Sequence, residues 1–367
     1  MSTSRSKGPN AGDVRATMPA SVGNRSTIHA LVLFGAALAL YLGAVVAGVA
    51  APWWPLKLLF SLANAFFLSI LFVIGHDACH GALTPSARLN AILGRIALLP
   101  SWHPYAGWEH AHNHVHHAWT NLRQKDYAWA PLTKEDYDRL PAWRRAMQRF
   151  YRTPLGLGAY YFFDVYLRRT IFPGRQFRGR MNMPRFVGDC LLVVAFIAAQ
   201  TAFLILAPRW FGSSSPLVES LFFGQWLPFA IWNWLIAFLI CLHHTHPRIP
   251  WFDDQQEWTF YKGQIQGTAH VQFPGPINWI IHNIMEHTAH HADPRIPLYH
   301  LAEAQESLTR AFPEDVVEHK FSWRSFRYML SVCQLYDYRA HRWTNWAGEP
   351  TSSQTIQAAT EEPEMAR

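Results

Sequence analysis

The 367-residue chain is poor in cysteine and in charge. Its four cysteines are scattered, with no CxxC pair among them: Cys79, Cys190, Cys241 and Cys333. The sequence therefore predicts neither a disulfide scaffold nor a cysteine zinc site, and it fits a reducing compartment. Charged residues make up only 16% of the chain against 50% hydrophobic residues, which excludes the highly charged disordered classes.

Motifs for built-in electron carriers are missing as well. No GxGxxG of a flavin or nicotinamide site follows a predicted strand, no iron–sulfur CxxC pattern occurs, and the haem-binding HPGG is absent. The zincin motif HExxH is absent too, because Asp77 follows His76 and no Glu lies between His76 and His80. These absences exclude a zincin-type protease and a chain that carries its own flavin, haem or iron–sulfur centre.

Long apolar runs are abundant. Four of them cover 30–50, 58–75, 190–208 and 217–242, and the last is broken or bent at Pro228. Each is long enough to cross a bilayer as a helix. The alternative is a set of core helices in a soluble protein, but four charge-poor runs of this length are hard to bury there. The first run is no signal peptide, since it lies far from the start and lacks a small-residue cleavage site.

The basic residues fall almost entirely on one predicted side of the membrane. With four spans, 30 of the 32 Lys and Arg lie in segments that share a face, and only Lys57 and Arg209 lie on the other. The positive-inside rule makes the basic face cytoplasmic. We therefore expect an integral membrane protein, in the bacterial inner membrane, with both termini in the cytoplasm.

The same topology predicts the fold. We expect an all-α integral membrane protein whose four transmembrane helices form two hairpins, with a helical cytosolic cap made by residues 76–185 and 243–346. A polar, mobile N-terminal tail is expected over 1–28, one domain over 29–346, and a disordered C-terminal tail over 347–367. Within the cap, the aromatic stretch 153–171 indicates an interfacial helix.

Histidine is the residue in surplus, with 20 copies. They cluster at 76–80, 110–117, 243–246 and 287–291, and each cluster follows a span or lies between completed hairpins, so all emerge on the cytoplasmic face. Imidazole suits Fe, Zn, Cu and Ni, and eight or more imidazoles exceed the needs of one tetrahedral zinc. The sequence therefore predicts two metal ions. In the second cluster, His112 and His116 share one helical face, while His110, His114 and His117 share a rival face. The isolated histidines are expected to be fillers: His29, His103, His300, His319 and His341.

These clusters resemble the three histidine boxes of the membrane fatty acid desaturase family. Residues 76–80 match the first box, HxxxH, residues 112–117 match the second in its HxxxHH form, and residues 287–291 match the third, HxxHH. An HxxHH register in the second box would require His where the chain has Asn113. The surroundings are similar to those of the omega-6 (delta-12) acyl-lipid branch, namely 244–247 with the acidic, Trp-containing stretch after it, and His282-Asn283 before the third box.

The resemblance implies a di-iron enzyme that uses O₂ to introduce a cis double bond into the acyl chain of a membrane lipid. The implied metal ligands are His76, His80, His112, His116, His117, His244, His287, His290 and His291. A histidine near the fourth span completes the set in that family; His243, His244 and His246 compete for this role, and His244 is chosen. Asp77, Glu109 and Asp126 are candidate acceptors for imidazole N–H groups.

The chemistry adds further expectations. Electrons must come from a separate donor, such as a small acidic ferredoxin or a cytochrome b5, docking on the basic face. No nucleic-acid partner is expected. Aromatic residues around 160–163 and 226–234 are candidate walls of an apolar tunnel. A hydroxylase, ketolase or epoxygenase on the same scaffold stays open, and a metal transporter is disfavoured because no His lies inside the predicted spans.

Overall fold

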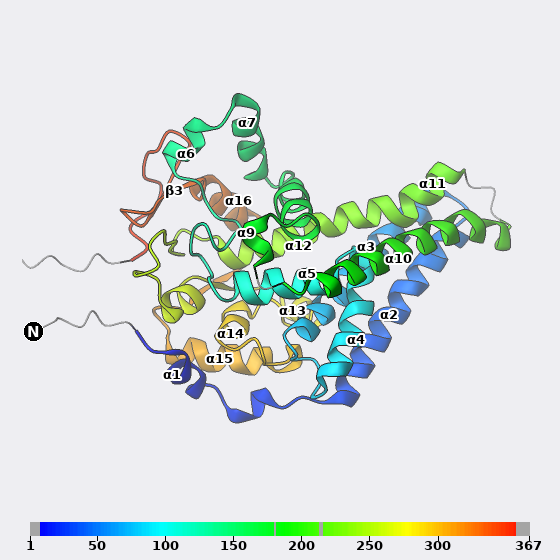
Figure 1. Ribbon diagram of the computed structural model, residues 1–367, viewed down its shortest axis with the longest axis horizontal. Coiled ribbons are helices and arrows are strands. Elements are labelled where there is room, and N and C mark those ends of the chain that lie inside the picture. Colours follow the sequence, from blue (N-terminus) through cyan, green and yellow to red (C-terminus); the bar gives the residue numbers. More distant parts are fainter. Residues whose placement is uncertain (1–7, 180, 213–215, 357–367) are drawn as a thin grey trace, which may run out of the picture.

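Long helices fill one half of the molecule and shorter helices gather in the other half (Figure 1). The computed structural model describes residues 8–179, 181–212 and 216–356. The α-helices are α1 Ala11–Ala16, α2 Thr27–Ala50, α3 Trp54–Cys79, α4 Ala87–Leu98, α5 Tyr105–Glu109, α6 Lys134–Arg139, α7 Ala142–Tyr151, α8 Leu157–Tyr160, α9 Arg175–Arg178, α10 Met183–Trp210, α11 Leu217–Leu221, α12 Leu227–His244, α13 Gly275–Ile280, α14 His287–Ala292, α15 Leu301–Ala311 and α16 Trp323–Val332.

Short 3₁₀ and π segments and two small sheets complete the secondary structure. The 3₁₀ turns are η1 Ala20–Gly23, η2 Leu99–Ser101 and η7 Leu298–His300, and the π-helical segments are η3 His110–His116, η4 Tyr161–Ile171, η5 Phe222–Trp226 and η6 Tyr261–Ile265. Strand β1 Ala269–Gln272 pairs in parallel with β2 Val317–Lys320, and β3 Leu335–Asp337 pairs antiparallel with β4 Arg342–Thr344. The expectation of an all-α chain holds apart from these two sheets.

Four helices among the described residues are long and apolar enough to cross a membrane. They are Thr27–Ala50, Trp54–Cys79, Met183–Trp210 and Leu217–His244, the last made of α11, η5 and α12. Each is longer than the apolar run that predicted it, because polar residues at the ends are helical as well. Ser26 caps α2 by accepting a hydrogen bond from the His29 amide, and α3 continues past Gly75 to carry His76.

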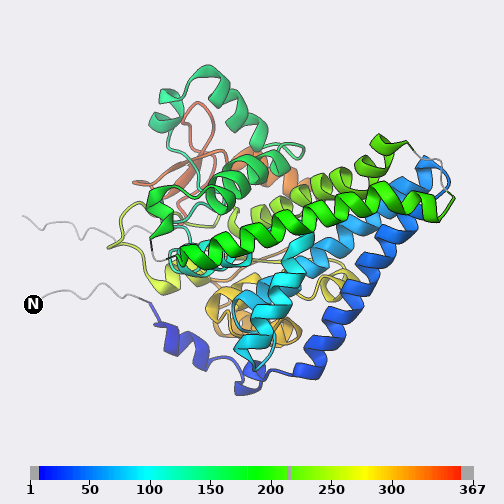
Figure 2. The same cartoon turned by 45° about the vertical axis from the view of Figure 1, so that its right-hand side comes forward.

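The bend expected at Pro228 takes the form of a π-helical segment. Pro228 lies in the first turn of α12, directly after η5. A proline lacks an amide hydrogen and its ring crowds the preceding turn, so the helix widens before it instead of breaking. Figure 2 shows the resulting helix running unbroken beside α10 to the far end of the molecule.

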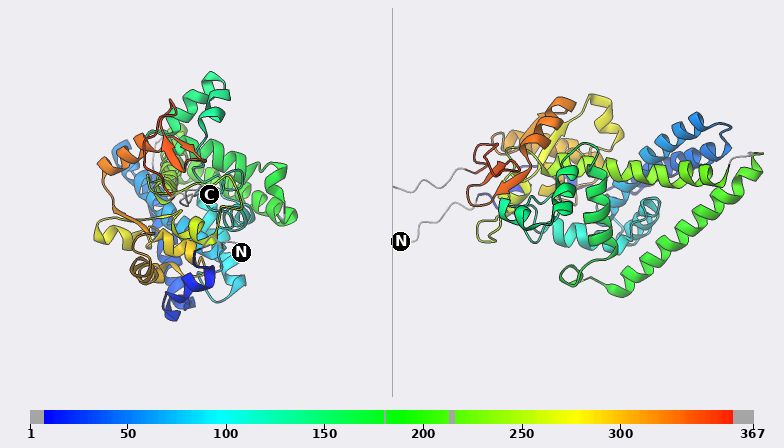
Figure 3. Two further views of the ribbon diagram at one scale, coloured as in Figure 1. Left: turned by 90° about the vertical axis from the view of Figure 1, so that its left-hand side faces the viewer. Right: turned by 90° about the horizontal axis from the view of Figure 1, so that it is seen from above.

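Close packing positions the long helices relative to one another. Helix α3 packs against α2, α4 and α12, and α10 meets α11 at the end far from the shorter helices (Figure 3). Gly94 of α4 allows a close approach, because a methyl group there would lie 2.3 Å from Tyr105 Cε2 and 3.0 Å from Ala78 Cβ. At the opposite end, buried Lys57 pairs with Glu219 at 3.1 Å. These contacts fix the position of α3 and therefore of His76 and His80 at its C-terminal end.

The N-terminal stretch, expected to be mobile, is folded over residues 8–26. Helix α1 buries Val14 completely, and Arg15 Nε donates to the Ala292 carbonyl at 3.1 Å, at the C-terminus of α14. The Ser26 amide donates to the Tyr299 hydroxyl at 2.7 Å. Three apolar side chains of this stretch, Val14 among them, are buried. Their burial favours folding of the stretch, although its overall composition is polar. Residues 1–7 lie outside the described part of the chain.

The C-terminal stretch is likewise ordered in its first part. The Thr351 amide donates to the Trp343 carbonyl at 2.9 Å and the Thr355 amide to the His341 carbonyl at 2.7 Å, so residues 350–355 run along β4. The rest of the tail that was expected to be disordered, 357–367, lies outside the described residues.

Candidate metal centre

All nine histidines predicted as ligands come together where α3 and α12 end, in two groups. The first group has five members, His76, His80, His112, His117 and His290, and the second has four, His116, His244, His287 and His291. Within each group, the nearest ring nitrogens all lie within 4.8 Å of one another. Each group takes its members from three of the four sequence clusters. The groups therefore form only when the chain folds.

Helix α3 supplies two members of the first group from one helical face. His76 lies in its last turn and His80 follows as the C-cap residue, and their rings meet edge to face with centroids 4.8 Å apart. The carboxylate of Asp77 is fully buried, accepts the Leu298 amide at 2.7 Å and so ties the end of α3 to η7. The i and i+4 spacing of the first box therefore acts as expected.

The second box is π-helical, so its histidines are grouped differently from those of an α-helix. The His117 amide donates to the His112 carbonyl at 2.9 Å, an i to i+5 bond that brings these two residues to one side. His112 and His117 join the first group, whereas His116 joins the second. His110 and His114 lie outside both groups, with ring centroids 5.7 Å apart, and neither of the two α-helical faces is brought together in one group. Asn113 donates to the Cys79 carbonyl at 2.8 Å and holds the first two boxes together.

The third box serves both groups. On α14, His287 and His291 belong to the second group and His290 to the first. The helix is held at both ends: the Ala289 amide donates to Gln305 Oε1 at 2.9 Å, and Arg15 binds the last carbonyl. These bonds satisfy a backbone amide near the start of α14 and a backbone carbonyl at its end, which have no partner within the helix, and so they stabilise this short helix.

Near the fourth span, His244 is the histidine that belongs to a group. Its Nε2 lies 3.0 Å from His287 Nε2. His243 stacks on His287 with ring centroids 3.7 Å apart, but its Nε2 faces Met285 Sδ at 3.3 Å. His246 stacks on His319, 5.0 Å away and outside both groups. Among the three candidates, His244 therefore remains the predicted ligand.

The spacing of the inward-facing imidazole nitrogens suits coordination of a metal better than hydrogen bonding among the rings. Nε2 of His112 lies 2.8 Å from His76 Nε2 and 3.1 Å from His117 Nε2, and His117 Nε2 lies 3.1 Å from His290 Nε2. A ring nitrogen carries either one proton or one lone pair, so a chain of four such atoms cannot satisfy itself by hydrogen bonds. Two imidazole ligands at right angles on a metal–nitrogen bond of about 2.1 Å would lie about 3.0 Å apart. The nitrogens His80 Nε2 and His291 Nε2 are buried without a partner.

Two side chains orient the second group from behind. Asp126 Oδ1 accepts from His116 Nδ1 at 2.9 Å, and Gln264 Oε1 accepts from His291 Nδ1 at 2.7 Å, which leaves both Nε2 atoms free for a metal. Gln264 also donates to the His117 carbonyl at 2.7 Å. Asp126 was expected in this role; Gln264 was missed, because a single Gln on η6 carries no motif. Glu109 was wrong, since it pairs with Arg185 at 2.9 Å.

Burial keeps the ligands that lie outside the spans neutral. Loss of solvation, with a smaller contribution from neighbouring imidazoles, holds the pKa of His112, His117 and His290 well below the ordinary 6.5. The pKa of His291 is lowered for the same reasons. Neutral imidazole is the form that binds transition metals. Of the predicted fillers, His103 is buried and contacts the Ser101 carbonyl at 2.7 Å, and none of the five belongs to either group.

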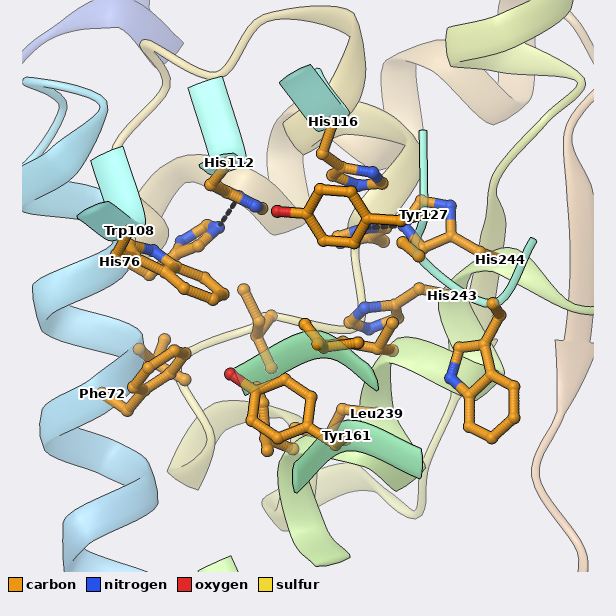
Figure 4. Close-up of a pocket in the computed structure, with 18 of the residues that line it drawn as sticks. Phe72, His76, Trp108, His112, His116, Tyr127, Tyr161, Leu239, His243 and His244 are labelled. Atoms are coloured by element: carbon orange, nitrogen blue, oxygen red, sulfur yellow. Dashed lines mark hydrogen bonds between the residues drawn. The ribbon is translucent and has the colours of Figure 1, made fainter. Parts of the chain in front are cut away.

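A largely apolar cavity adjoins the histidines (Figure 4). Figure 4 shows His76, His112, His116 and His244 on one side of it and Phe72, Tyr161 and Leu239 on the other. The cavity is lined by Phe72, Val73, His76, Trp108, His112, His116, Tyr127, Ala128, Trp129, Tyr160, Tyr161, Val165, Ile236, Leu239, Ile240, His243, His244, Ile284 and His287.

Of the two stretches predicted to line an apolar tunnel, one lines the cavity and the other does not. Tyr160 and Tyr161 line the cavity, but residues 226–234 do not, because α12 turns only its later residues, from Ile236 on, toward the space. The loop after the second box also lines the cavity, with Tyr127, Ala128 and Trp129, and it carries Asp126. Trp129 in that loop has a left-handed backbone conformation, with φ 60°, and its ring stacks on that of Tyr160 with ring centroids 4.3 Å apart. A buried non-glycine residue in this conformation costs on the order of 1–2 kcal/mol.

Comparison with known proteins identifies the family. Residues 51–323 match the model of the family described as fatty acid desaturase. The chain belongs to the fatty acid desaturase family. It is therefore an oxidoreductase of the desaturase class, as the histidine boxes predicted, and the transporter alternative falls away.

The relatives of this desaturase include cyanobacterial and plant enzymes. It is 30% identical over 326 residues to an sn-1 oleoyl-lipid 12-desaturase of Picosynechococcus sp., covering 89% of each chain. It is 27% identical to a protein of the same name from Synechocystis sp., over 84% of this chain and 82% of that one. It is 30% identical to a chloroplastic omega-6 fatty acid desaturase of Glycine max, of which the match spans 64%.

Proposed function

We propose that the protein is an O₂-dependent desaturase that introduces a cis double bond at the delta-12 position of an acyl chain in a membrane lipid. The observation that carries this proposal is the contact between two imidazole groups and one apolar cavity. His76 and His112 of the first group and His116, His244 and His287 of the second all line the cavity. The names of the cyanobacterial relatives give the position and the lipid substrate.

The metals proposed are two iron ions, held by the nine histidines of the two groups. Reduced iron with O₂ supplies an oxidant strong enough to remove two hydrogens from neighbouring methylenes, which no side chain can do. The chain itself contributes the neutral imidazoles, the orientation of His116 by Asp126, and the apolar walls. An acyl chain has no polar handle near its middle, so the shape of the wall near Tyr161 and Phe72 must set which carbons reach the histidines.

The membrane arrangement proposed is two hairpins with the histidine-bearing cap in the cytoplasm. The end of α3 carries His76 into the first group and the end of α12 carries His244 into the second. Both residues line one cavity, which supports placing both ends on one side of the bilayer. The distribution of basic residues favours the cytoplasmic face of the bacterial inner membrane for that side. The electron donor is proposed to be a separate acidic carrier of the ferredoxin or cytochrome b5 type.

Lipid analysis tests the proposed function. Expression in a bacterial host that is supplied with oleate and makes no dienoic acyl chains is expected to yield a dienoic chain lighter than its precursor by two hydrogens, with the new double bond at position 12. His290→Ala, expressed to the same level, should yield none. A product heavier by one oxygen would instead identify a hydroxylase or epoxygenase on this scaffold.

A further inference from the structure

The segment that follows the second box exposes large apolar side chains at the edge of the molecule. Trp143 is 61% exposed, Leu155 82% and Phe172 72%, with Phe150 at 48% and Phe163 at 49%. Trp143 and Phe150 lie seven residues apart on α7, so they project from one helical face. Figure 1 shows α7 protruding from the body at the top of the view. Soluble proteins rarely expose so many large apolar side chains along one segment.

The charge of the same segment is almost wholly positive. Between Ala142 and Phe172 the chain has six arginines, no lysine and a single carboxylate, Asp164. Arg144 and Arg168 flank this carboxylate at 3.8 and 3.6 Å, and the side chain of Arg168 is 61% exposed. Exposed apolar groups bordered by arginine match the layered chemistry of a bilayer surface, where anionic headgroups lie above acyl chains.

The depth of the segment along α12 supports the same partner. The Trp234 indole donates to the Pro154 carbonyl at 2.6 Å, and α8 packs on the Trp234 backbone at Gly158. At 1.5 Å per residue, Trp234 lies about 26 Å along the fourth span from Leu217. That distance falls within a hydrocarbon layer about 30 Å thick. Leu155, next to Pro154, therefore lies at the depth where acyl chains meet headgroups.

We propose that residues 142–172 form a membrane-docking surface whose partner is the anionic cytoplasmic leaflet. Trp143, Phe150, Leu155, Phe163 and Phe172 enter the acyl layer while the exposed arginines, Arg149 and Arg168, bind lipid phosphates. The inner side of the same segment, at Tyr160, Tyr161 and Val165, lines the cavity beside the histidines. Docking therefore holds a leaflet of lipid within one helix diameter, about 10 Å, of the cavity.

The test places a lipid-sensitive dye on the surface. The full-length chain with Cys190→Ser, which removes the only partly exposed cysteine, receives Leu155→Cys or the control Glu306→Cys and is reconstituted in lipid nanodiscs. The control side chain is 73% exposed on α15, far from this surface. A nitroxide carried on the lipid acyl chain should quench the dye at 155 and leave the dye at 306 unchanged. Quenching at neither position would overturn the proposal.

The charge is tested in the same discs. With phosphatidylglycerol and phosphatidylcholine mixed, the lipid retained after detergent exchange should favour phosphatidylglycerol, and Arg168→Gln should reduce that preference about fivefold. An unchanged preference would overturn the anionic partner. A dye at 155 that responds to an added acidic ferredoxin but not to lipid would assign the surface to an electron donor and overturn the proposal. None of these readouts requires turnover, so they remain independent of the desaturase assay.

Discussion

Replacing Asp126 with Asn should weaken the metal centre without disturbing the fold. Asp126 is 2% exposed and accepts from His116 Nδ1 at 2.9 Å, from the Asn121 amide at 2.9 Å and from the Ala128 amide at 3.0 Å. Asn keeps one oxygen for a backbone amide but loses the charge that fixes the His116 tautomer with Nε2 free. Loss of such an outer acceptor typically costs 10- to 100-fold in metal affinity or activity, or about 1.4–2.8 kcal/mol.

Glu109 provides the matched control. It is a carboxylate beside the second box, but it pairs with Arg185 and contacts no histidine of either group. Both variants, Asp126→Asn and Glu109→Gln, would be purified in detergent, challenged with a chelator and followed by metal content and by lipid product. Asp126→Asn should release metal at roughly 10- to 100-fold lower chelator concentration than wild type. Equal metal loss in both variants, or in neither, would refute the assigned role of Asp126.

Three further variants test separate parts of the structure. His112→Ala should abolish the lipid product while His114→Ala leaves most of it, by lipid analysis at matched expression; the reverse pattern would contradict the π-helical register. Arg15→Ala removes the cap from α14 and should lower the thermal midpoint and the metal retained after chelation, with partial recovery in Arg15→Lys; unchanged metal retention would show that α1 has no influence on the third box. Tyr161→Ala enlarges the cavity by one ring and should broaden the range of acyl-chain lengths accepted, whereas Tyr161→Phe should not; identical product profiles for both would place the specificity elsewhere.

The histidine clusters could be read from the sequence because they obey short-range geometry. His76 and His80 are one helical turn apart, and the i, i+3, i+4 spacing of the third box splits its members between two groups, which simple helical angles predict. The apolar runs predicted the four spans for a similar reason, since length and lack of charge decide that assignment within each segment.

Other features depend on contacts that no local pattern reveals. The π-helical turn that unites His112 with His117 is set by tertiary packing, and an α-helical reading favours the wrong neighbours. Gln264 lies more than 140 residues from His117, whose carbonyl it binds, so nothing near it in the sequence marks its role. The N-terminal stretch is polar on average, yet the burial of Val14 against the cap outweighs that composition.

Elemental analysis of the purified protein tests the central proposal most directly. The two histidine groups predict two iron atoms per chain when the protein is produced with both iron and zinc available. His80→Ala should reduce the first group and His287→Ala the second, so each variant should retain about one iron per chain while remaining inserted in the membrane. One zinc and no iron in the wild-type protein, or two irons in both variants, would contradict the account.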